Sequence, residues 1–509
     1  MKFILFILLL NGLFGQNRSY PEQAHKYIFP VNEFYNVLSF STITDVVEST
    51  NIIYFSTLGG GVLRYDKFKN EFLNPVTTAN GLHSNFIYGF LRNRTDSLSK
   101  YSQSVVPIYK DAEQHVMDLD EPDQFEPSYS SASFFKGYQL NDRKRLAHKL
   151  SESEFYTIQA PFTFFDGNIQ DKHQNEHKIT LRYIDSSNGV WVFAEGLGLF
   201  YSAFKNQPLE HIYNHSTLGS ITRIRKNNTD YWFAQHNMKQ RNRPILSVWK
   251  ANGAWKHWYE RDEFALQGNG IVDMLISDKS IWLAEEYGLV SFNLDTEDFS
   301  SKRFSGSYNN RTTSVIRMDS LLYFGTDVGL FSYSLLSGKV KEQKFKGLEK
   351  TPITSLTKGR KGFVTTTKWG VYFVNIKEQR IDNLESFAKL PRYRFSAVNY
   401  SNGNYQLGFS DGYYVFNEEQ KTLNACILTE PQRPIYVFSI KEVDGYTFLA
   451  TDNGVYIYYV EKNRWVYFNQ KNGLPVNRVN DIEIDGDYLI VGTDAGVSVF
   501  KWYDNFYWK

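Results

Sequence analysis

One short pattern recurs along this chain: a β-type run, a polar corner, a glycine followed by a hydrophobic residue, and a second β-type run. Two copies begin at Ile53 and Val190, and a degenerate copy without the glycine begins at Tyr231. A period of roughly 40 to 45 residues with about four short strands is the size of one β-propeller blade. The six most regular copies have corner glycines 41 or 42 residues apart: Gly288, Gly329, Gly370, Gly412, Gly454 and Gly496.

Each unit is expected to hold four strands with period-two alternation. In the last unit these are residues 479–484, 488–493, 496–501 and 505–508. A four-stranded sheet of this kind buries both of its apolar faces only when it packs between neighbouring sheets. Closing the stack into a ring then leaves only short sheet edges exposed. Two smaller rings would need more units than the pattern supplies. We therefore predict an all-β fold, a single large β-propeller of four-stranded blades with about nine units, eight to ten being compatible with the pattern, and one insertion.

The repeat disappears between residues 93 and 161, where an acidic stretch is followed by a run of small residues. We expect an insertion or a degenerate blade here, with a short helix over residues 140–155 and β structure over 156–167. The predicted division is a signal peptide over 1–16, the first propeller blade or blades over 17–92, this segment over 93–161, and the remaining blades over 162–509.

The first residues have the form of a secretory signal peptide. Lys2 precedes an apolar run that is too short to span a bilayer and that ends near Gly15. No cysteine follows this run, so a lipid anchor is not expected, and no later stretch approaches the roughly 20 apolar residues of a membrane-spanning helix. We expect a periplasmic or extracellular location.

The charge balance argues against two classes of partner. The 56 lysines and arginines face 55 acidic residues, so no large field of one sign is available to attract nucleic acid or an anionic membrane. The one cysteine, Cys426, cannot form an intrachain disulfide and lies in a β-type run, where a small buried apolar role is expected.

The residues of the last unit resemble a known family. Residues 464–500 resemble the two-component regulator propeller repeat, which has an aromatic strand, Asn-Gly-Leu, a Val/Ile strand, an Asp-Gly turn, and a Gly-Thr corner with a later glycine. The chain has Asn-Gly-Leu at 80–82 and 472–474, the corner at 325–329 and 492–496, and tryptophan before a corner at Trp191, Trp232 and Trp282. The resemblance covers most of residues 40–90 and 180–509.

The resemblance implies a periplasmic sensing propeller of the kind found in hybrid histidine kinases of Bacteroidetes-like bacteria, where such propellers recognise glycan fragments. The sequence is also similar to the propeller component of the type IX secretion surface attachment complex. After the repeats the sequence shows no membrane span, immunoglobulin-like extension, kinase or recognisable sorting domain, so we expect binding rather than signal transmission.

Catalytic and metal-binding patterns are weak. Residues 173–177 match the H-x-x-E-H string of zinc peptidases, but that site needs a helix, and here the string lies in a polar connection before a β-type run. His211 and His215 are expected to form a surface pair. No glycine-rich loop leads into a helix, so no nucleotide site is expected. We predict no metal and no cofactor.

Candidate ligand-binding residues lie in the loops that enter the presumed inner strands, which should gather on one face of the ring. Trp369 and Tyr413, at corners, were expected on the opposite edge, where they could stack on a ligand. Because Asn and Gly are ordinary turn residues, each polar position also has a purely structural interpretation. The six polar candidates are His83, Asn85, Asn310, Arg311, Asn477 and Arg478.

We hypothesise a secreted or periplasmic non-catalytic propeller that binds an envelope or surface protein, or a carbohydrate-like ligand, through loops at one face of the ring. A partner protein is slightly favoured. The alternative is a propeller-fold enzyme, a polysaccharide lyase or glycosidase, with paired carboxylates or a Lys/Tyr/His group at the central channel. The sequence leaves the oligomeric state open.

Overall fold

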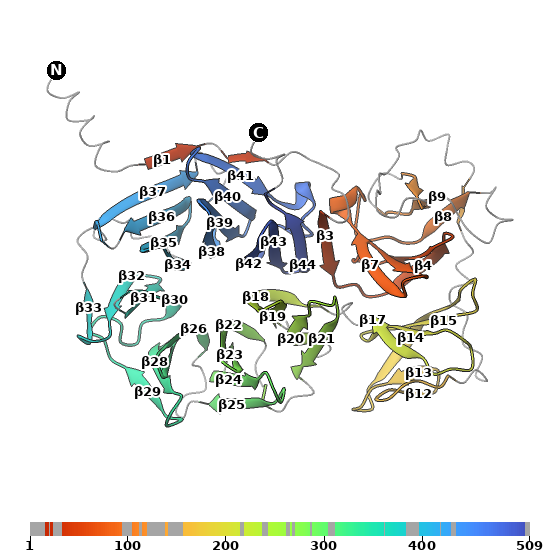
Figure 1. Ribbon diagram of the computed structural model, residues 1–509, viewed down its shortest axis with the longest axis horizontal. Coiled ribbons are helices and arrows are strands. Elements are labelled where there is room, and N and C mark those ends of the chain that lie inside the picture. Colours follow the sequence, from red (N-terminus) through yellow and green to blue (C-terminus); the bar gives the residue numbers. More distant parts are fainter. Residues whose placement is uncertain are drawn as a thin grey trace, which may run out of the picture.

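A computed structural model gives the structure of the chain (Figure 1). It describes residues 16–19, 21–23, 33–93, 104–110, 115–119, 138–140, 156–213, 218–236, 243–260, 265–266, 270–285, 288–303, 311–360, 362–382, 396–417, 419–428 and 434–503. These residues form strands and turns without any α-helix, so the predicted all-β propeller of four-stranded sheets is confirmed. The predicted signal peptide and most of the expected helix over 140–155 lie outside the described residues.

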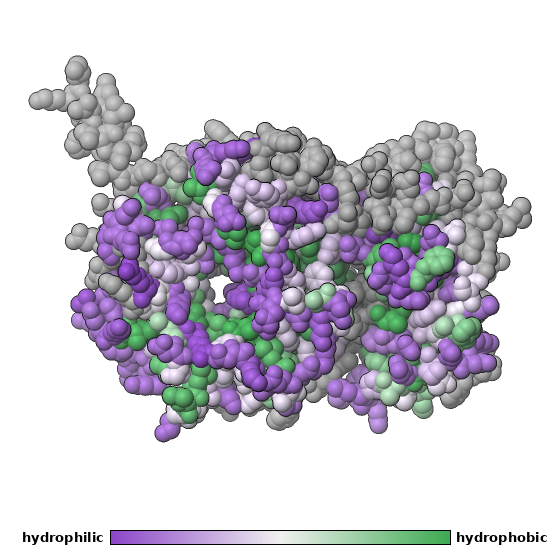
Figure 2. Space-filling view, viewed as in Figure 1, coloured by the Kyte–Doolittle hydropathy of each residue, from purple (hydrophilic) through white to green (hydrophobic). Residues whose placement is uncertain are grey.

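Seven sheets form a closed ring. Their innermost strands contact one another in the order β18, β22, β26, β30, β34, β38, β42 and back to β18, and Figure 2 shows an opening at the ring centre. The first four sheets are β18 (Ser220–Asn227), β19 (Asp230–His236), β20 (Pro244–Trp249), β21 (Trp255–Tyr259); β22 (Ile271–Ser277), β23 (Ser280–Glu285), β24 (Gly288–Asn293), β25 (Phe299–Arg303); β26 (Thr312–Met318), β27 (Leu321–Thr326), β28 (Gly329–Ser334), β29 (Val340–Gln343); and β30 (Ile353–Lys358), β31 (Gly362–Thr367), β32 (Gly370–Asn375), β33 (Arg380–Asp382).

The other three ring sheets take strands from both ends of the chain. The N-terminal strands β1 and β2 add a parallel outer strand to β37 and β41, respectively. The strands are β34 (Val398–Ser401), β35 (Asn404–Phe409), β36 (Gly412–Asn417), β37 (Thr422–Leu428), β1 (Gln16–Ser19); β38 (Val437–Val443), β39 (Tyr446–Thr451), β40 (Gly454–Tyr459), β41 (Arg464–Phe468), β2 (Pro21–Gln23); and β42 (Val479–Asp485), β43 (Tyr488–Thr493), β44 (Gly496–Lys501), β3 (Phe34–Leu38).

Three further sheets stack beside the ring, at the right of Figure 1. The β4–β7 sheet packs between the other two, because one of its faces shares a core with β8 and β9 and the other with β14–β16. We call these sheets the three-sheet group: β4 (Ile43–Glu48), β5 (Ile52–Thr57), β6 (Val62–Asp66), β7 (Glu71–Val76); β8 (Phe90–Asn93), β9 (Ser104–Pro107), β10 (Met117–Asp118), β11 (Tyr138–Leu140); and β12 (Thr163–Phe165), β13 (Asn168–Gln170), β14 (Glu176–Ile184), β15 (Val190–Ala194), β16 (Gly198–Ser202), β17 (Glu210–Tyr213).

The division into a ring of seven and a group of three differs from the single ring of about nine that the repeat favoured. The repeat reports the number of sheets, and the degenerate copy at Tyr231 is a ring sheet as expected. The repeat pattern carries no information on which sheets share an edge or a face. The segment from 93 to 161 contributes strands β9, β10 and β11 to the sheet of β8.

At the end of the three-sheet group, the outer face of strands β14–β17 is covered by side chains from residues that come before these strands in the chain. Ile169 of β13, with Tyr156 and the partly buried Phe164, packs against the outer face of the β14–β17 sheet. A terminal unit of a stacked array needs such a cover, because its last apolar face has no neighbour. The group is therefore an open stack with a covered end.

Strand β3 closes the ring from outside. It pairs antiparallel with β44 over five residues, from Phe34↔Phe500 to Leu38↔Gly496. The fourth strand of the last sheet was expected at residues 505–508, which lie outside the described residues. That place belongs to β3, because the outer edge of β44 is already paired with it. The chain then passes directly from β3 into β4 of the three-sheet group.

The two Asn-Gly-Leu motifs meet across β3. Each follows a short 3-10 turn, η1 (Thr78–Asn80) in the three-sheet group and η8 (Gln470–Asn472) in the ring. Asn36 of β3 donates from Nδ2 to Thr77 Oγ1 at 2.9 Å and to Gly473 O at 3.0 Å, so it bonds to both sides. Asn80 Nδ2 in turn donates to Phe34 O at 2.7 Å. The motif thus holds the three-sheet group against the ring.

Gly473 is needed for this contact. Its φ is 106°, and an added Cβ would lie 2.6 Å from Ala79 Cα across the joint. We predict that Gly473→Ala lowers the free energy of unfolding by about 3 kcal/mol, from the positive φ and the overlap together. Denaturant unfolding followed by tryptophan fluorescence measures this.

The control for that substitution is Gly486→Ala. Gly486 also has a positive φ, 56°, but nothing lies within 4 Å of an added Cβ there. We expect a loss of about 1 kcal/mol from the backbone conformation alone. Equal losses at the two positions would show that the packing of the two motifs does not matter.

Candidate functional site

The loops that enter the inner strands and the glycine corners lie at the same end of every sheet. Antiparallel pairing requires this, as in the pairing of Ile353, at the start of β30, with Thr367, at the end of β31. We call this end the loop face. The expectation that Trp369 lies on the opposite edge is therefore wrong, since its corner follows Thr367 directly.

Tyr413 is not available for stacking on a ligand. Its side chain is buried, and its hydroxyl contacts Thr447 Oγ1 of the neighbouring sheet at 2.9 Å. The alternation of β36 turns this residue toward the next sheet. By contrast, Trp369 is 64% exposed, with Lys368 Nζ 4.4 Å from its ring centre.

A recess at the mouth of the central channel brings two predicted residues together. It has a volume of about 290 Å³ and receives Arg311 from the loop before β26 and Arg478 from the loop before β42. Neither position is close to the other in sequence, so only ring closure makes them neighbours. The recess, which we call the channel mouth, is lined by Ser220, Thr222, Arg223, His236, Val272, Arg311, Phe438, Arg478, Asn480 and Asp494.

The wall of the channel below the mouth carries an ionic network. Arg223 Nε lies 2.9 Å from Asp273 Oδ1, and Arg225 Nη1 lies 2.9 Å from Asp481 Oδ2. Asp481 is almost fully buried and also accepts a hydrogen bond from Ile224 N at 2.9 Å. It therefore joins the last ring sheet to the first through both backbone and side chain.

The same joint recurs between other sheets. Asp273 Oδ2 accepts from Val315 N at 2.9 Å, and Asp45 Oδ2 accepts from Phe90 N at 3.1 Å in the three-sheet group. In each case a carboxylate on one inner strand binds a backbone N–H of the next. These carboxylates are occupied by structural bonds.

The neighbouring cations set the ionisation of Asp481. Burial alone would raise its pKa, but the guanidinium groups of Arg225 and Arg223 and the ammonium group of Lys441 outweigh burial and hold the pKa below its ordinary value. Asp481 is thus a stable carboxylate and a poor general acid.

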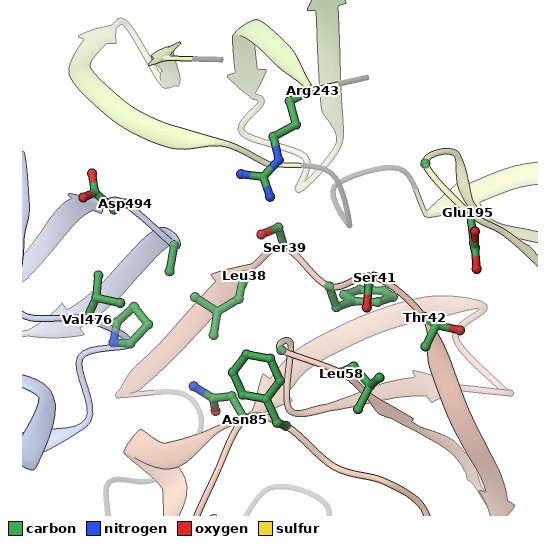
Figure 3. Close-up of a pocket in the computed structure, with 16 residues that line it drawn as sticks. Leu38, Ser39, Ser41, Thr42, Leu58, Asn85, Glu195, Arg243, Val476 and Asp494 are labelled. Atoms are coloured by element: carbon green, nitrogen blue, oxygen red, sulfur yellow. The ribbon is translucent and has the colours of Figure 1, made fainter. Parts of the chain in front are cut away.

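A larger groove separates the ring from the three-sheet group (Figure 3). Its volume is about 710 Å³, and it shares the lining residue Asp494 with the channel mouth, so the two recesses are neighbours on the loop face. Figure 3 shows Arg243 reaching in from the ring side and Leu58 and Asn85 lying on the side of the three-sheet group. The groove is lined by Leu38, Ser39, Phe40, Ser41, Thr42, Leu58, Gly59, Asn85, Phe86, Glu195, Gly196, Arg243, Pro475, Val476, Asp494 and Ala495.

Asn85 and Asn477 serve the loops themselves. Asn85 Oδ1 accepts from Thr78 N and Asn477 Oδ1 accepts from Gln470 N, each at 2.9 Å, so both side chains hold the turn before an Asn-Gly-Leu motif. The two residues occupy equivalent places after the two motifs. Their structural interpretation is the better supported one.

His83 is not at the channel mouth. The His83 ring packs against the His115 ring, 4.5 Å between centres, in the three-sheet group. Burial, followed by the proximity of His83, lowers the pKa of His115 to about 4. Asn310 lies outside the described residues.

The H-x-x-E-H string begins in the turn between β13 and β14 and ends in the first two residues of β14, so its predicted non-helical setting is confirmed. Asp171 Oδ1 accepts from the backbone N of His173, and Asp171 Oδ2 lies 3.3 Å from Nε2 of the buried His177. His177 Nδ1 contacts Glu195 O at 2.8 Å. The string is a turn tied down by Asp171. No group of three or more His, Cys, Asp or Glu side chains suited to a metal occurs within the described ranges.

Two further residues that the sequence singled out, His211 and Cys426, have structural roles. His211 Nε2 contacts Leu197 O at 2.9 Å, while His215 lies outside the described residues. Cys426 is buried in β37, as expected, and burial raises the pKa of its thiol to about 11.

Sequence reasoning missed the channel network. Its signal was a set of charges on the first strands of ring sheets, as at Arg223 and Arg225, two residues apart in β18, and Asp481 in β42. Charges on strands that line the channel could have been recognised as partners of one another.

No family model matches the chain, and no curated protein sequence matches it. Among solved structures, the extracellular domain of a hybrid two-component system protein from B. thetaiotaomicron is 15% identical, with a TM-score of 0.47, over 90% of this chain and 64% of that chain. PorZ, a surface component of the type-IX secretion system of Porphyromonas gingivalis, is 13% identical, with a TM-score of 0.47, over 91% of this chain and 69% of that one.

The WD40 repeats of RRP9 are 13% identical, with a TM-score of 0.44, over 56% of this chain and 94% of that chain. The two bacterial proteins are of the kinds that the repeat resembles in sequence. At these identities the likeness concerns the fold. Within the described part of the chain, no helix is long and apolar enough to cross a membrane.

We predict that Asp481→Asn lowers the free energy of unfolding by about 2 kcal/mol, because it removes the closer of the two carboxylates that face the half-buried Arg225 guanidinium, the other being Asp273 at 3.5 Å. The matched control is Asp485→Asn on the same strand, where the Lys226 ion pair is 39% exposed on the aspartate side and is worth below about 1 kcal/mol. Denaturant titration of both variants decides this.

The same residue predicts a pH dependence. Because the folded pKa of Asp481 lies below its ordinary value, its contribution to stability is present above about pH 4 and is lost as the pH falls through the folded pKa. Asp481→Asn should therefore lose less stability than the parent chain on acidification below pH 4. A parallel decline of the two proteins would contradict the ionic role.

Proposed function

We propose that this chain is a non-catalytic binding propeller of the bacterial cell envelope that holds a partner protein on its loop face. The observation that carries the proposal is the groove, which is lined from both the ring and the three-sheet group and lies next to the channel mouth. Loops from the ring and from the three-sheet group contribute to one recessed surface. Recessed surfaces built by several loops on a rigid scaffold are the usual place for recognition.

Exposed aromatic side chains support a protein partner over a sugar. Phe86, Trp369 and Tyr436 are 56%, 64% and 41% exposed, and they lie on the loop face of three different sheets. Aromatic anchors of this kind are enriched in protein interfaces. Their spread around the face exceeds the reach of a single sugar ring, although a carbohydrate-like ligand stays an outcome of the experiment below.

The enzyme alternative has less support. Asp273 and Asp481, the carboxylates that face the channel, each bind an arginine and a backbone N–H. Ser247 Oγ lies 2.6 Å from His257 Nδ1, but Ser247 is fully buried and also accepts from Gln235 Nε2. Burial is also the main cause that lowers the pKa of His257 to about 3. That histidine would be a weak base.

The envelope location rests on the N-terminal sequence, which has the form of a signal peptide. We propose that the mature chain acts in the periplasm or outside the cell. Expression of the full sequence with a cleavage-sensitive tag, followed by fractionation, measures this location directly.

We predict that Phe86→Asp weakens capture of the partner from envelope extract at least about tenfold, as expected for loss of an interface hot spot. The control is Phe68→Asp, which changes a residue 76% exposed on the β6–β7 turn, at the end of its sheet opposite the loop face. The captured protein is then purified and its affinity for both variants is measured.

Equal loss of affinity in the two variants, or none in either, would place the interface elsewhere. If no protein is captured and a neutral glycan raises the melting temperature of the parent chain but not of Phe86→Asp, the carbohydrate version replaces the protein version.

A further inference from the structure

The channel mouth concentrates positive charge in a chain that is almost neutral overall. Its lining includes the guanidinium groups of Arg223, Arg311 and Arg478, against one carboxylate, Asp494. Arg223 is already occupied, because its Nε contacts Asp273 Oδ1 and its Nη1 donates to Thr222 O at 2.7 Å. The charge that is left to attract a ligand lies on the other two arginines.

Arg311 is the freer of the two. Its side chain is exposed at the mouth, and no hydrogen bond or ion pair links it to any residue that the structure describes. Only its backbone is engaged, since its carbonyl accepts from Asp327 N at 3.2 Å. The position of its Cα at the start of β26 is therefore fixed while the guanidinium stays open.

Arg478 is held in place without being neutralised by close contact. Its guanidinium carbon lies 4.7 Å from the ring centre of Phe438, and its Nε donates to Asn480 Oδ1 at 3.0 Å. Asp494 Oδ2 is 3.7 Å away, beyond ordinary hydrogen-bond distance. Stacking on an aromatic face leaves the outer N–H groups of an arginine free to bind a second partner.

The one carboxylate at the mouth is occupied elsewhere. Asp494 Oδ1 accepts from Ser220 Oγ at 2.6 Å and from Asn480 Nδ2 at 2.8 Å. These bonds tie the corner before β44 to the first ring sheet. Asp494 thus holds the rim and does not close over Arg311.

We propose that the channel mouth binds a single carboxylate group, held between Arg311 and Arg478. Guanidinium groups bind carboxylates through paired N–H···O bonds, and both guanidinium groups line this recess. A monoanion matches the charge, because Arg223 is balanced by Asp273 and Arg478 in part by Asp494, which leaves about one positive charge. This inference rests on the proposed function and specifies the ligand chemistry at that face.

The shape of the recess indicates that an end group enters. The mouth holds about 290 Å³, and the channel beneath it, about 220 Å³, is lined by the arginine–aspartate network. A recess of this size suits a single end group of a longer chain. The carboxylate of a terminal acidic sugar and the C-terminal carboxylate of a polypeptide both fit this description.

The test measures calorimetric binding of two probe pairs to the mature chain: trigalacturonic acid against its methyl ester, and a tripeptide with a free C-terminus against its C-terminal amide. We expect the free acid of at least one pair to bind at least tenfold more tightly than its neutral form. Arg311→Gln and Arg478→Gln should each reduce that affinity at least tenfold. The pair that discriminates identifies the source of the carboxylate.

The control variant is Arg360→Gln, which changes an exposed arginine paired with Glu419 at 2.6 Å, in the turn before β31 at the other end of its sheet. It should bind as the parent chain does. Equal binding of acid and neutral forms, absence of binding, or affinity that is unchanged in both mouth variants would overturn the carboxylate site. Capture of a partner that depends on Phe86 would survive those results, so failure of this inference and failure of the proposed function can be told apart.

Discussion

The structure depends on one strand that is shared by two neighbours. An exposed sheet edge offers unpaired N–H and C=O groups, and β3 covers the edge of β44 so that the seventh sheet is complete. Because the chain runs directly from β3 into β4, the pairing that closes the ring also fixes where the three-sheet group lies. Asn36 adds side-chain bonds to both sides at once. The strand that completes the last ring sheet therefore also sets the position of the three-sheet group, and with it the groove between the two.

The inner strands use a second device, a buried carboxylate that binds the backbone of the next sheet. At Asp481 it spans the closure between the last and first ring sheets and also receives Arg225. A charge is costly to bury unless it is paired, so each such joint requires its arginine or its N–H partners. These joints line the channel wall with paired charges, whereas Arg311 and Arg478 at the loop face keep charge available for a ligand. The charges that join the ring sheets are therefore distinct from those proposed to bind a ligand.

Much of this fold could be predicted from glycine corners and period-two alternation, because both are local. The corner at Gly496 and the strands around it follow from residues that are adjacent in sequence. Which sheets share faces could not be predicted, since β3 and β44 are separated by almost the whole chain. The site divides in the same way. Asn85 and Asn477 were predicted as ligand-binding candidates, and their side chains hold turns. Arg311 and Arg478 both line the channel mouth because of the ring. Asp481 was missed because its partner, Arg225, is distant in sequence.

The pairing of β3 with β44 can be tested directly by a disulfide. The side chains of Asn36 and Ser498 face each other across the two strands, with Ser498 Oγ donating to Asn36 Oδ1 at 2.5 Å. A chain carrying Asn36→Cys and Ser498→Cys should form this bond on mild oxidation, as shown by peptide mapping, and should unfold at a higher denaturant concentration oxidised than reduced. Absence of the 36–498 cross-link in a folded protein, while each single variant folds normally, would contradict the account of how the ring is closed.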